Sequence, residues 1–139
     1  MKTAEFIAAR LATMPYAKTL GVEPVVRDGE FRLSLPFKET NIGNPMGPAL
    51  HGGAIGGFME LCAIIQLMLE MERDGQPKPI GISADYLRPG RPEDTLAEAK
   101  VKRLGTRVAN VRVVAWQSDR EKPIATLHGN FLLPAKTGD

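Results

Sequence analysis

Hydrophobic and polar residues follow several different periods along the chain, and the first of them is helical. Residues 3–14 place apolar side chains on one face of a helix, and Thr3 can cap its start. That face consists of Phe6, Ile7, Leu11 and Met14. Residues 16–21 are expected to form a connector. Residues 1–17 therefore predict a short N-terminal helix that leads into this connector.

A period of two replaces the helical period after Val22. Residues 22–27 and 30–36 read as strands, and they flank Asp28-Gly29, a favoured two-residue hairpin turn. Four further strand-like runs fill the second half of the chain, at 80–87, 95–104, 108–118 and 123–133. No helical segment separates these runs. Their spacing predicts an antiparallel meander.

The longest apolar run, residues 52–71, predicts a long helix that is apolar nearly all round and therefore buried on most sides. Gly53, Gly56 and Gly57 are poor helix formers. Their presence predicts close approach by another backbone or by a ligand. The fold class is then α+β, a single domain with an antiparallel sheet wrapped around one central helix. One helix covers only one face, so the other face or an open edge should meet a second subunit.

Composition narrows the function classes. The 139 residues suit one domain, and 18 Lys and Arg against 16 Asp and Glu leave a charge of +2, too balanced to indicate nucleic-acid binding. Residues 1–6 lack the apolar core of a signal peptide, and Glu60 and Gln66 interrupt the apolar run before it reaches a bilayer span. A cytoplasmic protein with no membrane partner is expected. With two histidines and no acidic cluster beside either, no metal site is expected.

The chemistry that the sequence suggests lies around the start of the long helix. Free N–H groups in the first turn, at Gly52, favour an oxyanion or a polarised carbonyl oxygen. Glu60 follows roughly 12 Å further along the axis. If both act on one substrate, Glu60 should come from a neighbouring subunit. Two alternatives remain open: Glu60 is a structural carboxylate bonded to a strand or to an arginine such as Arg88 or Arg107, and His51 only braces the turn.

Three segments together resemble the hotdog-fold acyl-CoA thioesterases: residues 44–53, Glu60, and residues 85–89. The resemblance covers roughly residues 20–134 and is closest to the phenylacetate-degradation type, whose relatives act on 4-hydroxybenzoyl-CoA and medium-chain acyl-CoAs. Many relatives carry aspartate where this chain has Glu60, and one branch carries glutamate. The resemblance implies a homodimer, or a dimer of dimers, with active sites at the subunit interfaces.

The resemblance also implies catalytic roles. The N–H of Gly52 would polarise the thioester carbonyl, and Glu60 would attack the carbonyl carbon or activate water. Asn44 would orient the water or the acid. His51 would support the loop and approach the thioester.

Coenzyme A would bind as part of the substrate, with no separate cofactor. Its phosphates favour arginine side chains and loop N–H groups. The candidates at strand ends are Arg88, Arg91, Arg103 and Arg107, with Gly105 between the last two. The alternative for each arginine is that it flanks a turn and is simply solvated.

The predicted activity is hydrolysis of an acyl-CoA thioester, aromatic or short to medium in chain length, to a free acid and coenzyme A. One alternative is a non-catalytic module that binds acyl-CoA on the same fold. The other is a dehydratase of 3-hydroxyacyl thioesters, in which His51 and Glu60 would form the acid–base pair.

Overall fold

A computed structural model describes residues 4–38 and 52–135 of the chain. Asn44 and His51, two of the predicted site residues, lie outside the described residues. The elements follow the order α1 (Ala4–Ala12), α2 (Pro15–Leu20), β1 (Glu23–Arg27), β2 (Glu30–Leu35), α3 (Gly52–Glu70), β3 (Lys78–Tyr86), β4 (Thr95–Leu104), β5 (Val108–Trp116) and β6 (Ala125–Leu132). The predicted long helix and the strands are thus confirmed to within a few residues at their ends.

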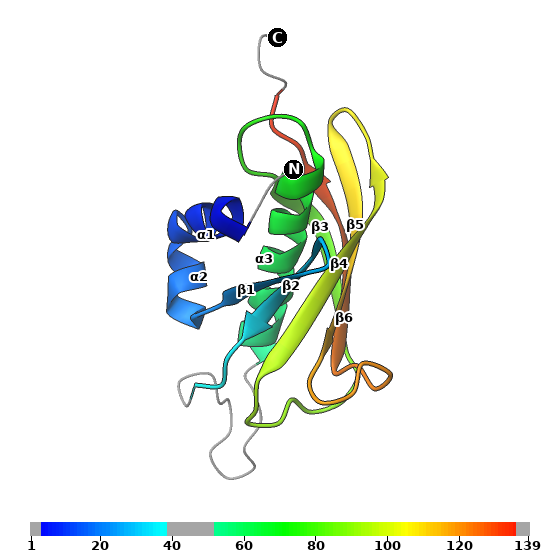
Figure 1. Cartoon of the computed structure of the whole chain (residues 1–139). Helices are drawn as coiled ribbons and strands as arrows, with labels where there is room; N and C mark the ends of the chain where they lie inside the picture. Colours follow the sequence, from blue (N-terminus) through cyan, green and yellow to red (C-terminus); the bar gives the residue numbers. More distant parts are fainter. Residues whose placement is uncertain (1–3, 39–51, 136–139) are drawn as a thin grey trace.

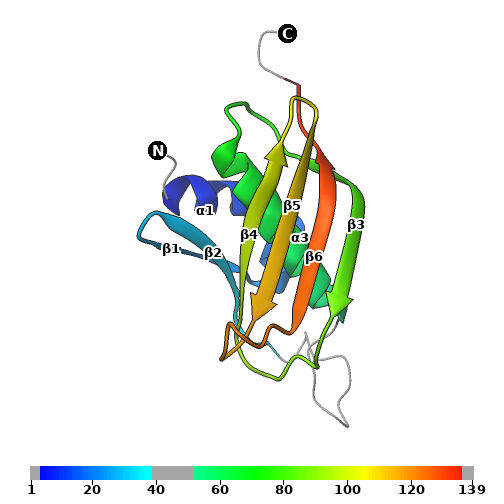
Figure 2. The same cartoon turned by 90° about the vertical axis from the view of Figure 1, so that its right-hand side faces the viewer.

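The strands form one 6-stranded sheet in the order β1-β2-β4-β5-β6-β3, and every neighbouring pair is antiparallel. The sheet curves around α3, which lies against its concave face (Figure 1). Figure 2 shows β4, β5, β6 and β3 side by side across the helix. This confirms the α+β prediction of a sheet wrapped around a central helix, the hotdog fold.

The prediction of a meander was wrong for one strand. Strands β4, β5 and β6 pair in sequence, but β3 pairs with β6 instead of β4 and forms an edge of the sheet. The segment 87–94 therefore passes the ends of β5 and β6 to connect β3 with β4. A period of two reveals that a segment is a strand, but it does not specify the strand's partner.

The predicted connector at residues 16–21 was also wrong, because residues 15–20 form the helix α2. Pro15 occupies the first turn, where its missing N–H costs nothing. Gly21 ends the helix with φ 74°, and its N–H donates to the carbonyl oxygen of Ala17 at 2.9 Å. Both end signals were present in the sequence. Figure 1 shows α1 and α2 on the side of α3 that faces away from the sheet.

The hairpin turn between β1 and β2 is confirmed. Asp28 and Gly29 both have positive φ, 53° and 78°, as a type I′ turn requires.

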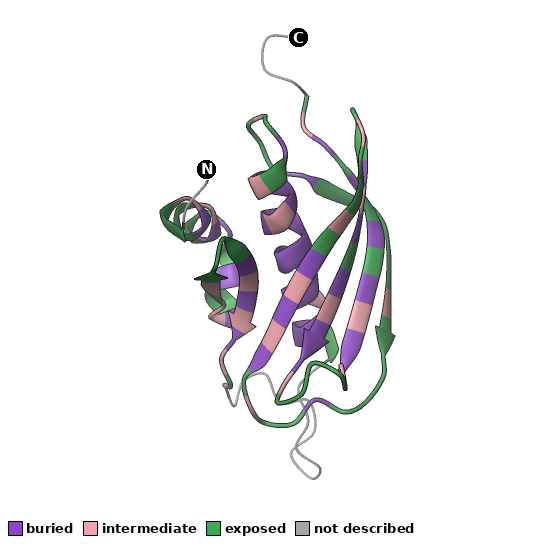
Figure 3. Ribbon diagram, turned by 45° about the vertical axis from the view of Figure 1, so that its right-hand side comes forward, coloured by how far each residue is buried: buried purple, intermediate pink, exposed green. Residues whose placement is uncertain are grey.

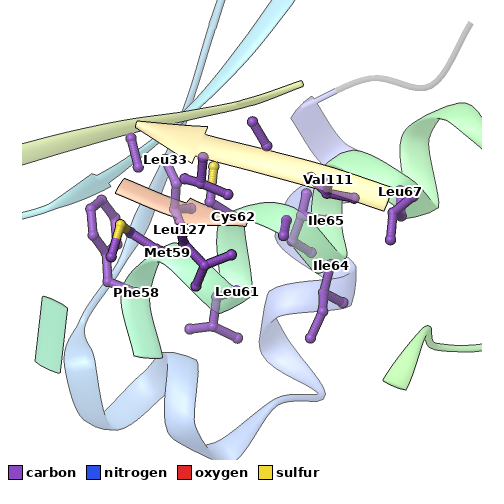
Figure 4. Close-up of a cluster of buried hydrophobic side chains, with 14 of the residues drawn as sticks. Leu33, Phe58, Met59, Leu61, Cys62, Ile64, Ile65, Leu67, Val111 and Leu127 are labelled. Atoms are coloured by element: carbon purple, nitrogen blue, oxygen red, sulfur yellow. The ribbon is translucent and has the colours of Figure 1, made fainter. Parts of the chain in front are cut away.

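The core lies between the sheet and α3 and continues between α3 and the N-terminal helices. Buried residues alternate with more accessible ones along β2, β5, β6 and the first half of β4, as expected of strands with one face toward the core (Figure 3). From α3, Phe58, Cys62 and Ile65 pack into the same cluster as Leu33 and Val111 of the sheet (Figure 4). By length and composition α3 could cross a membrane, but most of it is buried inside this fold. Such burial is typical of a core helix.

Candidate functional site

The first turn of α3 is held by two tyrosines from different elements. Tyr86, at the end of β3, donates its hydroxyl to the carbonyl oxygen of Gly52 at 2.9 Å. Tyr16, in α2, donates its hydroxyl to the carbonyl oxygen of Gly53 at 3.2 Å. The N–H groups of a first helical turn lack acceptors within the helix. The two tyrosines thus tie the first turn of α3, which carries the predicted oxyanion donor at Gly52, to β3 and α2.

The same tyrosines explain the glycines in α3. A Cβ on Gly56 would lie 2.9 Å from the hydroxyl oxygen of Tyr86, and a Cβ on Gly57 would lie 2.7 Å from Cζ of Tyr16. Both distances are too short for real atoms. The expectation of close approach was right, but at these two positions it comes from tyrosine side chains and not from another backbone or a ligand.

Glu60 lies in the middle of α3, in the same continuous helix as Gly52. The rise of the helix separates the two residues of one chain by roughly 12 Å. One chain therefore does not bring the Glu60 carboxylate and the Gly52 N–H to a single carbonyl group.

The environment of Glu60 is partly buried and offers its carboxylate no described partner. Its side chain is partly buried, and within residues 4–38 and 52–135 it makes no hydrogen bond or ion pair. Arg88, a suggested structural partner, instead donates to the carbonyl oxygen of Pro123 at 2.7 Å. Burial without a compensating partner raises the pKa of the Glu60 carboxyl above its usual value. Groups perturbed in this way are common at functional sites.

The candidate coenzyme A residues fall into two groups at opposite ends of the sheet. Arg88 follows β3 near the start of α3. Arg103, Gly105 and Arg107 line a pocket of about 700 Å³ where β4 turns into β5. Strand register places Tyr86 beside Ala125, and Lys78 beside Leu132, which itself pairs with Val108.

The distance between the two groups follows from the length of the sheet. Ala97, in line with the Arg88 end, and Leu104 are separated by about 23 Å at about 3.3 Å per residue. One chain thus brings Arg103, Gly105 and Arg107 together, and leaves Arg88 apart.

Tyr16 and Tyr86 are the site residues that sequence reasoning missed. Tyr86 belongs to the 85–89 segment that carried the family resemblance, so a signal for it existed. For Tyr16 the only local signal was the neighbouring Pro15, which marks the start of α2.

Two other side-chain types bear on the chemistry. Cys62 is completely buried, and desolvation strongly raises the pKa of its thiol, so it does not act as a nucleophile. No group of three His, Cys, Asp or Glu side chains in the described part of the chain could hold a metal ion. The expectation of no metal site stays a prediction, because Asn44 and His51 lie outside that part.

Comparisons with known proteins bear on the family of this chain. Residues 47–124 match the Thioesterase superfamily. The medium/long-chain acyl-CoA thioesterase YigI of Escherichia coli is 30% identical over 117 residues, which cover 72% of this chain and 74% of that protein.

Solved structures share the fold. A crystal structure of a protein from Chromobacterium violaceum has 42% sequence identity and a TM-score of 0.76, covering 94% of this chain and 90% of that one. A phenylacetic acid degradation-related protein from Ralstonia eutropha JMP134 has 21% identity and a TM-score of 0.77, covering 91% and 98%. The family match and the identity to YigI support the predicted hydrolase over the binding module and the dehydratase. The chain belongs to the thioesterase superfamily and is an enzyme that hydrolyses thioesters.

Proposed function

We propose that the protein hydrolyses an acyl-CoA thioester to a free acid and coenzyme A, with Glu60 as nucleophile or general base. The observation that carries the proposal is the environment of Glu60, a partly buried carboxylate without a described partner in a pocket on the central helix. Acyl-CoA as the substrate class is supported by the named activity of the E. coli relative.

The site is proposed to be shared between two subunits of a homodimer. Strand β3 is an edge strand, and nearly all of its residues are exposed. It carries the exposed apolar side chains Ile80 and Ile82, 57% and 37% accessible. An exposed apolar edge of this kind invites pairing with another strand. Antiparallel pairing of β3 with its copy about a two-fold axis would make the two α3 helices antiparallel. Glu60 of one subunit would then approach Gly52 of the other.

The same dimer would also reunite the coenzyme A candidates. Antiparallel β3 strands bring the Tyr86 end of one subunit beside the Lys78 end of the other. Arg88 of one protomer would then lie at the same end as Arg103, Gly105 and Arg107 of its partner. The residues that one chain leaves at two opposite ends of the sheet would thus line one entrance, where arginine side chains and loop N–H groups suit phosphates.

In the proposed reaction, the Gly52 N–H stabilises the negative charge that develops on the carbonyl oxygen. Glu60 either attacks the carbonyl carbon, forming an anhydride that water then cleaves, or removes a proton from an attacking water. The C–S bond breaks in either route, and the coenzyme A sulfur leaves as thiolate and takes up a proton. Asn44 is proposed to orient the water or the acid. His51 is proposed to support the loop before α3.

The catalytic role of Glu60 is tested by Glu60→Gln assayed on a panel of acyl- and aroyl-CoAs. Loss of a general base or nucleophile should lower kcat by about 10²–10⁴-fold. Glu70→Gln is the matched control, since Glu70 is an exposed carboxylate of the same helix that accepts a hydrogen bond from Gln66. Full turnover by Glu60→Gln would remove Glu60 from the mechanism. No turnover by the wild type on any thioester would overturn the acyl-CoA proposal.

The dimer is tested at the two edges of the sheet. Ile82→Lys on β3 should yield a monomer in analytical ultracentrifugation and should abolish hydrolysis, because Glu60 and Gly52 no longer meet. Val26→Lys is the control on the opposite edge strand β1, where Val26 is 43% exposed. A monomeric wild type, or an Ile82→Lys variant that stays dimeric and active, would overturn the shared site.

A further inference from the structure

The pocket beside Glu60 is built by the central helix and the turn between α1 and α2. Gly57, Glu60, Leu61 and Ile64 occupy one face of α3 at helical spacing. Leu61 and Ile64 point away from the strands, toward the N-terminal helices (Figure 4). Residues 13–16 form the opposite wall, and Gln76 completes the lining. The pocket has a volume of about 270 Å³.

The lining of this pocket is mostly apolar. Met14, Leu61 and Ile64 are at most 6% exposed and present hydrocarbon or thioether surface. Thr13 directs its hydroxyl to the carbonyl oxygen of Arg10 at 2.7 Å, so it is already bonded within its own helix end. No arginine or lysine of the described chain lines the pocket. Phosphates and the amides of a pantetheine arm need polar partners, whereas hydrocarbon gains from an apolar lining.

Tyr16 closes one wall of the pocket. Its ring lies directly on Gly57, and its hydroxyl is bonded to the carbonyl oxygen of Gly53 at 3.2 Å. Tyr16 is nevertheless 46% exposed, so part of its side chain faces solvent while the ring packs on Gly57. A ligand group that extends from Glu60 along α3 toward Gly57 therefore contacts the tyrosine ring.

We propose that this pocket receives the acyl group of the thioester and that Tyr16 is the residue that limits the size of the acyl group. The inference rests on the proposed function, because it takes the reacting carbonyl to lie at Glu60. The two substituents of the carbonyl carbon then point in different directions. The sulfur leads to the pantetheine arm, and the acyl group enters the apolar pocket beside the Glu60 carboxylate.

The volume indicates the class of acyl group. A cavity of about 150 Å³ holds benzene, and pockets for larger ligands have about 300–1,000 Å³. A pocket of about 270 Å³ therefore suits an aromatic ring with a short linker or a short to medium linear chain. A longer chain that follows α3 past Gly57 would press against the Tyr16 ring.

The experiment compares kcat/KM for butanoyl-, phenylacetyl-, octanoyl- and dodecanoyl-CoA. The wild type should favour the first three over dodecanoyl-CoA. Tyr16→Ala should raise the dodecanoyl-to-octanoyl ratio by about tenfold or more, since one methylene in an apolar pocket already changes kcat/KM by about 10- to 200-fold. Tyr16→Phe keeps the ring and should keep the wild-type ratio.

A second variant changes Gly57, the residue on which the Tyr16 ring packs. Gly57→Ala places a methyl group where the Tyr16 ring lies, so it should displace the ring and shift the ratio in the same direction as Tyr16→Ala. This variant keeps the inference testable if Tyr16→Ala does not fold.

The outcomes separate the two proposals. Glu60-dependent hydrolysis with an unchanged chain-length ratio in the folded variants would overturn the acyl pocket and leave the proposed function intact. An equal loss of activity on all four thioesters would reduce Tyr16 to a structural role and also overturn the inference. A wild type that hydrolyses none of them would overturn the proposed function and, with it, the pocket assignment.

Discussion

Replacing Glu60 by glutamine should leave the protein at least as stable as the wild type at neutral pH, although the proposed mechanism requires a large fall in kcat. The carboxylate is partly buried, and none of the described residues forms a hydrogen bond or ion pair with it. A fully buried polar group without a partner costs about 1–3 kcal/mol. Because Glu60 is only partly buried and glutamine carries no charge, we expect a gain of about 0.5–1 kcal/mol at pH 8.

The sign of the pH dependence follows from the raised pKa. The folded protein holds the Glu60 proton to a higher pH than the unfolded chain, whose carboxyl titrates near 4.5. Wild-type stability therefore falls as pH rises from about 4.5 through the raised pKa of Glu60, and it stays lowered above that pKa. The advantage of Glu60→Gln should be present at pH 8 and should shrink toward pH 4, where both side chains are neutral.

The assay is urea unfolding at fixed protein concentration, followed by the fluorescence of Trp116, the single tryptophan of the chain. Glu70→Gln should change stability by less than about 0.5 kcal/mol, as expected of an exposed position. A loss of more than about 1 kcal/mol in Glu60→Gln at pH 8 would refute the reasoning. It would mean that a partner stabilises the carboxylate, as the structural alternative requires.

Three further predictions concern the scaffold. Glu98 accepts hydrogen bonds from Arg120 and Arg32, and these bonds lower the pKa of its carboxyl from 4.5 despite partial burial. Glu98→Gln should therefore lower the free energy of unfolding by about 1–2 kcal/mol at pH 7. That loss should disappear as pH falls through the lowered pKa, as urea unfolding at pH 7 and pH 3 can measure. Gly21→Ala should lower the free energy of unfolding by about 1–2 kcal/mol, because φ 74° strains an L-residue; an unchanged midpoint would contradict the observed α2 end. The buried Cys62 should react with a thiol reagent only after unfolding, and fast labelling of the native protein would contradict its burial.

Local patterns determined much of the fold. The two-residue turn at Asp28-Gly29 and the long helix beginning at Gly52 follow from positive-φ preferences and helical periodicity, which act over a few residues. The separation of Gly52 and Glu60, about 12 Å, also needed only the rise of a helix. From that distance and the family resemblance, the amino-acid sequence by itself predicts a site shared between subunits.

The tertiary structure decided what depends on contacts between distant segments. It placed β3 beside β6, put the Tyr16 ring on Gly57, and separated Arg88 from Arg103 by the length of the sheet. Tyr16 and Gly57 are far apart in the chain, and neither residue type signals the other. Hydrophobic periodicity records which face of an element is buried but not what buries it. The pocket beside Glu60 therefore depends on how the N-terminal helices pack against α3, which no local pattern encodes.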